Sequence, residues 1–247
     1  MSRIPGPLLR ALAGASYESP NDFARKVVSV TTLLQPPRIA VLRARHTELP
    51  PPPPEEAIAA LIGTGGHKAL EELARPPERA EVRLTCPITR TGWTLSGMCD
   101  LYDPSIATLF DYKYTKASAF PFGPKPDWTA QLNMLDYLFT YNQLHVSGLI
   151  AVQIAVDYNP AELERSKPGK YPTECIKCHD IDIWQEEETI EFMEERVRAL
   201  ESALAELPLC TDEERWAGRL RDGSTIYRRC QKWCPVRSVC DMRDSGT

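Results

Sequence analysis

Apolar and β-branched residues predominate in two neighbouring segments, 93–101 and 106–112, which are joined by Asp-Pro-Ser at 103–105. Residues of the first kind favour strands, whereas Asp, Pro and Ser favour turns. The pattern therefore predicts a β-hairpin. Alternating apolar positions predict a further core strand at 79–86, and a segment that is apolar on both faces predicts a buried strand at 147–158.

Helices are expected on both sides of these strands. An amphipathic helix is predicted at 23–34. A second helix, at 55–62, is expected to break at the glycine-rich segment 63–66, where Thr64 is a plausible N-cap for a further short helix. His67 would then lie in the first turn of that further helix.

The second half of the chain carries two stronger helical patterns. Asp127 is a suitable N-cap for a helix that runs to about residue 144, and one face of this helix is apolar except for Gln131 and Asn142. Apolar residues spaced three and four apart predict a long helix at 190–207 with an acidic back. A proline run at 50–54 is expected to act as a stiff spacer.

Composition places the chain among globular proteins. Its 247 residues, 43% of them hydrophobic, can bury a substantial core, and one domain with an elaboration is expected. No apolar run reaches the roughly 18 residues that span a bilayer. Residues 1–5 lack the apolar segment of a secretory signal, so a cytoplasmic protein is expected.

The net charge of −5 is unevenly distributed. Residues 186–206 carry eight acidic and two basic side chains, whereas residues 210–243 carry eight basic and five acidic ones. The acidity is thus assigned mostly to one helix, and a negative total does not exclude a polyanionic partner. Basic clusters such as 113–125 and 215–237 are candidates for phosphate contacts, with solvated surface as the other interpretation.

Two carboxylates and an ammonium are expected to meet at the predicted hairpin. Because side chains alternate along a strand, Asp111 and Lys113 share one face, and Tyr112 points away and leaves its carbonyl near that face. Together with Asp100 on the neighbouring strand, this set suits a hard divalent cation and phosphodiester hydrolysis. The other interpretation is an ordinary ion pair between Lys113 and Asp111.

The spacing of an Asp, about ten residues and then Asp-x-Lys at the end of an apolar strand resembles the motif of the PD-(D/E)XK nuclease superfamily. The match is to the branch that includes the RecB and Cas4 nucleases. The glycine-rich segment around His67 resembles the upstream histidine motif of that branch, and Gln131 resembles its downstream glutamine. The tyrosine that usually follows four residues later is replaced by Leu135, with Tyr137 as a substitute on another helix face.

The resemblance implies an α/β fold of the restriction-endonuclease type. A mixed sheet flanked by helices would carry a helical N-terminal cap and a C-terminal metal-cluster lobe. The implied division is 1–54 for the cap and proline-rich spacer, 55–207 for the nuclease core and 208–247 for the cysteine-cluster lobe.

The resemblance also implies a ligand set for Mg²⁺ or Mn²⁺ and a catalytic set that overlaps with it. The implied metal ligands are His67, Asp100, Asp111 and the backbone carbonyl of Tyr112. The implied catalytic residues are Asp100, Asp111, Lys113 and Gln131. Lys113 would activate or orient water, and Gln131 would position the substrate. Glu81 is expected either to support the metal site from outside the ligand set or to face solvent.

The implied activity is that of a metal-dependent DNA nuclease. An exonuclease is expected that acts on single-stranded DNA or DNA ends in replication, recombination or repair, in a bacterial cell or a phage-infected host. A helicase or recombination protein would be a further partner, and the choice of DNA rests on the resemblance alone. One alternative is a catalytically weak accessory protein of a recombination or CRISPR-type complex that binds nucleic acid, and another is a zinc-stabilised interaction protein.

Eight cysteines are present, and without a sign of secretion metal ligation is favoured over disulfides. Four of them near the C-terminal end can hold a zinc ion or a [4Fe-4S] cluster: Cys210, Cys230, Cys234 and Cys240. The segment 230–240 resembles the cluster segment of the iron-sulfur nucleases, whose further ligand usually lies far upstream; here Cys210 would serve. The pair Cys175 and Cys178 lacks a second pair at zinc-finger spacing.

Overall fold

The computed structural model describes residues 21–50 and 54–241. Its strands are β1 (Val27–Ser29), β2 (Arg79–Ile88), β3 (Trp93–Asp103), β4 (Thr108–Thr115), β5 (Gly148–Ala155), β6 (Ile176–Asp180), β7 (Ala217–Arg219) and β8 (Thr225–Tyr227). Its α-helices are α2 (Val30–Leu33), α3 (Pro37–Arg45), α4 (Pro54–Leu73), α5 (Pro126–Tyr141), α6 (Pro160–Arg165) and α7 (Glu186–Ala205). The shorter helical turns are η1 (Phe23–Arg25), η2 (Ala117–Phe122) and η3 (Arg229–Trp233).

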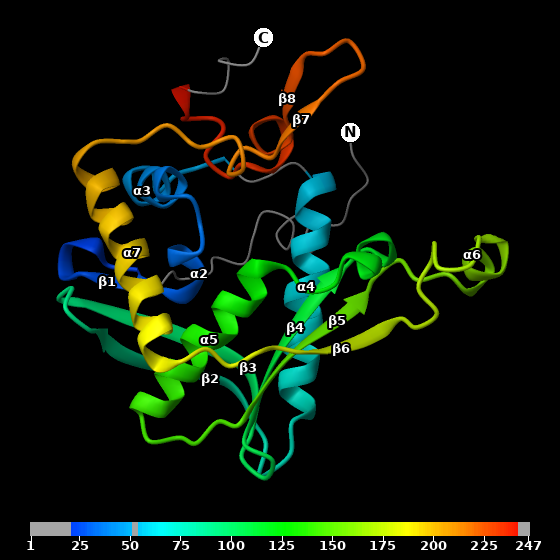
Figure 1. Cartoon of the computed structure of the whole chain (residues 1–247), viewed down its shortest axis with the longest axis horizontal. Coiled ribbons are helices and arrows are strands. Elements are labelled where there is room, and N and C mark those ends of the chain that lie inside the picture. The colour runs from blue at the N-terminus through cyan, green and yellow to red at the C-terminus, as the bar shows by residue number, and fades with distance from the viewer. Residues whose placement is uncertain (1–20, 51–53, 242–247) are drawn as a thin grey trace.

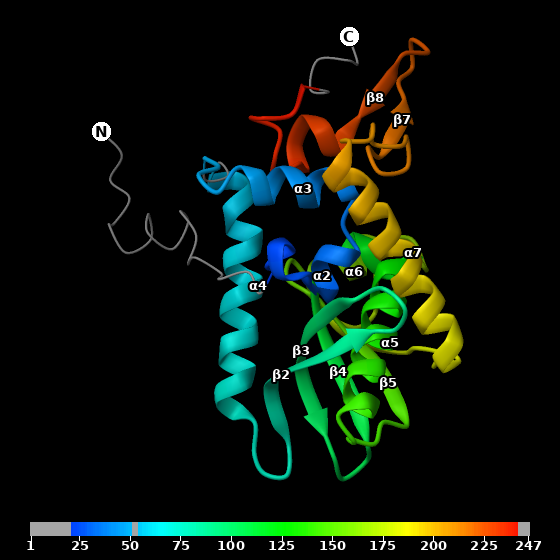
Figure 2. The same ribbon diagram turned by 90° about the vertical axis from the view of Figure 1, so that its left-hand side faces the viewer.

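Six strands form one mixed sheet that lies between helices. Helix α4 covers one face of the sheet and α5 the other, and α7 packs beside α5 (Figures 1 and 2). The side chains between the sheet and these last two helices make up the main core, including Leu132, Leu138, Met193 and Val197. The predicted mixed sheet flanked by helices is confirmed.

The strand order is β1-β3-β4-β5-β6, with β2 paired to the other edge of β3. Strands β3 and β4 form the predicted antiparallel hairpin, in which Leu101 lies opposite Phe110. Strand β5 runs parallel to β4, and β6 is antiparallel to β5. An interior position for β5 agrees with a segment that is apolar on both faces.

An opening interrupts one edge of β3. Strand β1 pairs with residues 94–96 and β4 with residues 101–103, so on this edge residues 97–100 have no partner strand in the described sheet. Helix α5 packs against the opening at Gly97, where an added Cβ atom would lie 2.4 Å from a methyl carbon of Leu138. Asp100 lies at the end of the opening, next to β4.

The helix predicted at 23–34 is wrong. This segment forms η1, the three-residue strand β1 and the short helix α2 instead. Val27 and Val28 pair in parallel with Thr94 and Leu95 of β3, and Val28 is fully buried. Burial of β-branched residues against the sheet therefore overrides the helical periodicity.

The predicted break at residues 63–66 is also wrong, because α4 continues through them from Pro54 to Leu73. Gly66 allows a close approach to β4. A Cβ atom on Gly66 would lie 2.2 Å from the hydroxyl oxygen of Tyr114, closer than real atoms come. Thr64 is therefore inside a helix and caps none, and His67 lies well inside α4.

The helices of the second half follow the predictions more closely. Helix α5 begins two residues earlier than expected, with Lys125 as its N-cap, so that Asp127 lies in the first turn and caps nothing. Its acidic side chain still suits the positive end of the helix dipole. The predicted long helix is α7, and its buried residues include Ile190, Met193 and Val197.

The C-terminal lobe consists of the β7–β8 hairpin, η3 and the residues that follow it, and it lies above α3 (Figure 2). Cys234 and Val236 pack there against Ile39 and Leu42 of α3. The domain boundaries stay predictions. No described helix is long and apolar enough to cross a membrane. The predicted lack of a signal at 1–5 and most of the proline spacer fall outside the described residues.

Candidate metal centre and active site

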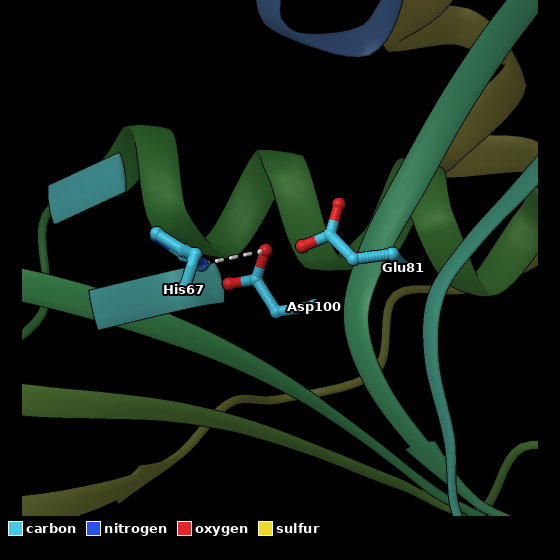
Figure 3. Close-up of side chains that lie close together, drawn as sticks. All are labelled: His67, Glu81 and Asp100. Atoms are coloured by element: carbon cyan, nitrogen blue, oxygen red, sulfur yellow. Dashed lines mark ion pairs between the residues drawn. The ribbon is translucent and has the colours of Figure 1, made fainter. Parts of the chain in front are cut away.

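Three candidate metal ligands come together from three elements: His67 of α4, Glu81 of β2 and Asp100 of β3 (Figure 3). One ligand atom of each lies within 4.8 Å of the other two, and His67 Nδ1 is 3.3 Å from Asp100 Oδ1. Within residues 21–50 and 57–241, no other histidines, cysteines or carboxylates form such a group of three. The arrangement brings one nitrogen and two carboxylates to a common point.

Glu81 reaches this point through a left-handed backbone conformation. Its φ angle is +52°, which residues with a side chain rarely adopt, and it has no partner in the register between β2 and β3. Burial, followed by the charge of Asp100, raises the pKa of its carboxyl. Regular strand alternation carries no signal that marks Glu81 as a ligand. Strained backbone is frequently found at functional sites.

Asp100 also replaces part of the missing strand pairing. Its Oδ2 accepts a hydrogen bond of 2.6 Å from the backbone N–H of Tyr112 on β4. Its other oxygen faces His67, and this hydrogen bond raises the pKa of the imidazole. The carboxylate is therefore fixed from two sides, by the Tyr112 backbone and by the His67 ring.

A second polar group lies next to the first. Gln131 of α5 donates a hydrogen bond of 2.9 Å from Nε2 to Asp111 Oδ1, and its Oε1 accepts one of 2.7 Å from Lys113 Nζ. Lys113 Nζ is also 2.5 Å from Asp111 Oδ2, as the predicted shared strand face requires. The ammonium is thus oriented by a carboxylate and an amide.

Asp111 is the most deeply buried member of this group, with 2% of its surface exposed. Burial raises the pKa of its carboxyl to about 6, although Lys113 acts in the opposite direction. Despite the ion pair, Asp111 Oδ2 has no hydrogen bond of acceptable geometry among the described residues. This oxygen keeps a free lone pair that can serve a cation.

The predicted site residues therefore fall into two adjacent groups. Asp111 is outside the set formed by His67, Glu81 and Asp100, although the charge of Asp100 contributes to its raised pKa. Tyr112 supplies its backbone N–H to Asp100, and a role for its carbonyl as a ligand stays a prediction. The hydroxyl of Tyr137 lies 3.2 Å from that of Thr89, away from both groups.

The donor atoms suit a divalent cation. Carboxylate oxygens with an imidazole nitrogen are ligands for Mn²⁺, and carboxylates with water are ligands for Mg²⁺. A cation at this point would offset the mutual repulsion of Glu81 and Asp100 and would lie beside the Lys113 group. Such an arrangement can polarise a phosphoryl oxygen and supply an activated water.

The eight cysteines of the chain are free thiols. Cys210, Cys230, Cys234 and Cys240 share one neighbourhood: burial raises the pKa of the Cys210 and Cys234 thiols, and the charges of Cys230 and Cys240 add to both shifts. A tetrahedral zinc site would need sulfur atoms roughly 3.8 Å apart. No three of these described sulfurs lie within 4.8 Å of one another, so a compact zinc site is not preformed.

Two basic residues of the lobe that were candidates for phosphate contact stack within the lobe. The guanidinium carbon of Arg215 lies 3.3 Å from the ring centre of Tyr227, and that of Arg229 lies 4.4 Å from the ring centre of Trp216. Cation–π contacts of this kind stabilise a small fold that has little apolar core. Cys175 and Cys178 are exposed. Cys175 directly precedes the edge strand β6, and Cys178 lies within it.

The chain is similar to known proteins in structure, although not in sequence. No family model matches the chain, and no curated protein matches it in sequence. The crystal structure of SSO0001 is similar to it, with a TM-score of 0.57 and 17% identity over 96% of this chain and 92% of that one. That likeness establishes the fold.

Two exonuclease structures are more distantly similar. A phage-related exonuclease from Haemophilus somnus 129PT matches with a TM-score of 0.35 and 15% identity, over 60% of this chain and 70% of that one. LHK-Exo in complex with dAMP matches with a TM-score of 0.35 and 18% identity, over 71% and 90%. At these scores neither likeness carries an argument about the site.

Proposed function

We propose that this protein is a divalent-metal-dependent nuclease that hydrolyses phosphodiester bonds in DNA, as an exonuclease on single strands or ends. The observation that carries the proposal is the group of His67, Glu81 and Asp100 next to an oriented Lys113 ammonium. A protein that only binds nucleic acid needs neither a group of partly buried carboxylates nor an ammonium oriented beside it. Metal-assisted phosphodiester hydrolysis uses both, the carboxylates to hold the cation and the ammonium to stabilise negative charge.

Mg²⁺ or Mn²⁺ would be held by His67, Glu81 and Asp100, with Asp111 and the Tyr112 carbonyl as further proposed ligands, and would supply Lewis acidity at the phosphate. Lys113 is placed to orient the attacking water or to stabilise negative charge on a phosphoryl oxygen. Gln131 keeps the Lys113 side chain in that position. The water oxygen would bond to phosphorus while the bond to the leaving oxygen breaks.

The choice of DNA rests on the resemblance of the motifs to those of the PD-(D/E)XK nucleases. Support for single strands comes from the segment that directly follows β4. Phe120 of η2 is buried, but Phe122 is 85% exposed and free to stack on an unpaired base. Roles in recombination or repair, and a helicase as partner, belong to the same proposal.

We also propose that Cys210, Cys230, Cys234 and Cys240 hold a [4Fe-4S] cluster, with structural zinc as the alternative. Four thiols in one neighbourhood are the donor set that both centres use. Protein purified without oxygen would be brown with iron-sulfur and colourless with zinc.

The activity is tested with anaerobically purified protein and end-labelled single- and double-stranded DNA, with Mn²⁺, with Mg²⁺ and with chelator. Asp111→Asn and Lys113→Ala are compared with wild type, and Arg198→Ala is the control because this exposed cation of α7 lies outside both groups and outside the basic clusters named above. We expect metal-dependent cleavage that both site variants lose by about 10²–10³-fold, which is typical for removal of one stabilising donor.

Two results would contradict the nuclease proposal. Wild-type protein that binds DNA and never cuts it would favour the accessory-protein function. Site variants that cut as well as the Arg198→Ala control would remove Asp111 and Lys113 from the catalytic set.

A further inference from the structure

Arg38 of α3 is a buried cation in the contact between the N-terminal helix and the C-terminal lobe. The residue is 5% exposed. Its Nη1 donates a hydrogen bond of 2.9 Å to the carbonyl of Pro208, and its Nη2 pairs with the carboxylate of Asp241. Pro208 precedes Cys210 by two residues, and Asp241 directly follows Cys240. One side chain therefore joins the two segments that carry the first and the last of the four cysteines.

The surroundings of Arg38 leave part of its charge and one donor unmatched. Its Nε has no hydrogen-bond partner among the described residues, although it is buried. Asp241, the carboxylate beside it, is 84% exposed at its side chain, so solvent screens that pair. A buried cation without full compensation is costly. The site thus fits a further anionic group.

The four cysteines supply such a group when they bind metal. Four thiolates outweigh the charge of a zinc ion or of an oxidised [4Fe-4S] cluster, so either centre carries net negative charge. Cys240 and Asp241 both interact electrostatically with the Arg38 guanidinium. Ile39 and Leu42, on the same helix, pack against Cys234 and Val236, so helix and thiols form one small core.

We propose that Arg38 is a positioning residue for a metal–thiolate centre at Cys210, Cys230, Cys234 and Cys240. Its guanidinium ties the Cys210 and Cys240 segments together and offsets the negative charge of the centre. This inference rests on the proposed cofactor and is independent of the proposed nuclease activity. It gives the N-terminal helix α3 a role in assembling the C-terminal lobe.

The test compares Arg38→Met, Arg38→Lys and wild type, all purified without oxygen. Arg43→Met is the matched control, because Arg43 is an exposed arginine on the same helix. Bound iron and zinc are counted per chain, and the loss of metal to a chelator is followed over time. Where the metal is iron, the midpoint potential is measured too, and the melting temperature of each metal-free variant reports folding.

We expect Arg38→Met to weaken metal retention about 10–100-fold, as is typical when an outer partner of a metal site is removed. Its midpoint potential should become more negative, because the reduced centre carries more negative charge and loses a nearby cation. Arg38→Lys should restore part of both properties, since it keeps the charge and loses the forked hydrogen bonds. Arg43→Met should behave as wild type.

Three outcomes would overturn the inference. Equal metal retention in Arg38→Met and Arg43→Met would show that Arg38 does not serve the centre. Weak retention in Arg38→Lys and Arg38→Met alike, with an unchanged potential, would make Arg38 a steric link only. Wild-type protein that holds neither iron nor zinc would remove the cofactor and Arg38's role together, while the DNA-cleavage assay would still report the nuclease independently.

Discussion

The sheet site and the C-terminal lobe both carry candidate metal-binding side chains, but they differ in how closely the fold brings these side chains together. In the sheet site, long regular elements already bring His67, Glu81 and Asp100 within 4.8 Å of one another. In the lobe, strands of three residues and a short helical turn carry cysteines whose sulfurs are not gathered so closely. The first is organised by the fold, whereas the second would be organised by the metal centre proposed for it.

The difference follows from the apolar core under each region. The sheet site lies on a core that includes Leu132, Leu138 and Val197, each less than 1% exposed. The lobe rests on a small cluster of Ile39, Leu42, Cys234 and Val236. Binding energy of a metal is folding energy where no preformed site exists. We therefore expect metal removal to affect the two regions unequally.

Amide hydrogen exchange before and after anaerobic removal of metal gives the largest expected effect. Amides of residues 210–240 should exchange about 10³-fold faster in the metal-free protein, because the lobe loses its main stabilising contact. Amides of β3 and β4 should change little. Equal acceleration in both regions would contradict the distinction between a site organised by the fold and one organised by its metal.

The pH dependence of Mn²⁺ binding tests the sheet site alone. The pKa of His67 is raised by Asp100, and that of Asp111 is raised to about 6 by burial, so both groups bind protons more readily than usual. Metal needs the deprotonated forms, and each displaced proton weakens binding about tenfold per pH unit. Isothermal titration should therefore show Mn²⁺ affinity falling as the pH drops through the raised pKa of His67, and falling more steeply below about 6, where Asp111 also takes up a proton.

The stability of the metal-free protein should depend on pH in the opposite direction to Mn²⁺ affinity. A raised folded pKa means that the native state binds more protons than the unfolded state, so these two groups add stability as the pH falls. For Asp111 this gain develops from about pH 6 downward, and for His67 it is lost as the pH rises through its raised pKa. A melting temperature of Asp111→Asn with the same pH slope as wild type would contradict this account.

Two neighbouring glycines of α4 offer a smaller and matched comparison. Gly66→Ala should lower the free energy of unfolding by about 1–3 kcal/mol, since its Cβ would overlap the Tyr114 ring. Gly65→Ala meets no atom within 4 Å and should raise it by about 0.5–1 kcal/mol. Denaturant unfolding measures both, and addition of Tyr114→Ala should rescue Gly66→Ala. Equal effects of the two alanines would mean that α4 does not approach β4 this closely.

The sequence was sufficient for the centre of the fold and for part of the site. The hairpin of β3 and β4 was predictable because alternation and turn residues agree at 93–112. The same alternation placed Asp111 and Lys113 on one face, and helical spacing allowed Gln131 to reach them, as the hydrogen bonds between these side chains show. Local chemistry and tertiary structure coincide in this region.

The predictions fail where a tertiary contact or backbone strain determines the local structure. The glycine-rich pattern around Gly66 predicts a helix break, but in the structure Gly66 leaves room for the Tyr114 ring. The segment 27–29 became a strand because β3 offers it a partner. Glu81 enters the ligand group through a left-handed φ angle that its neighbours in sequence do not announce. Each case depends on a residue more than ten positions away or on backbone strain.

The hydrogen bond from Tyr112 N–H to Asp100 Oδ2 makes this carboxylate a substitute for a main-chain carbonyl in the sheet. Asp100 thus links β3 and β4 by a side-chain hydrogen bond and is also a candidate metal ligand. A chain that lost metal chemistry but kept this fold would still need a side-chain oxygen at that position. Asp100→Asn keeps an oxygen that can accept this hydrogen bond, and Asp100→Ala does not. The two substitutions therefore separate the role of Asp100 in the fold from its role as a candidate ligand.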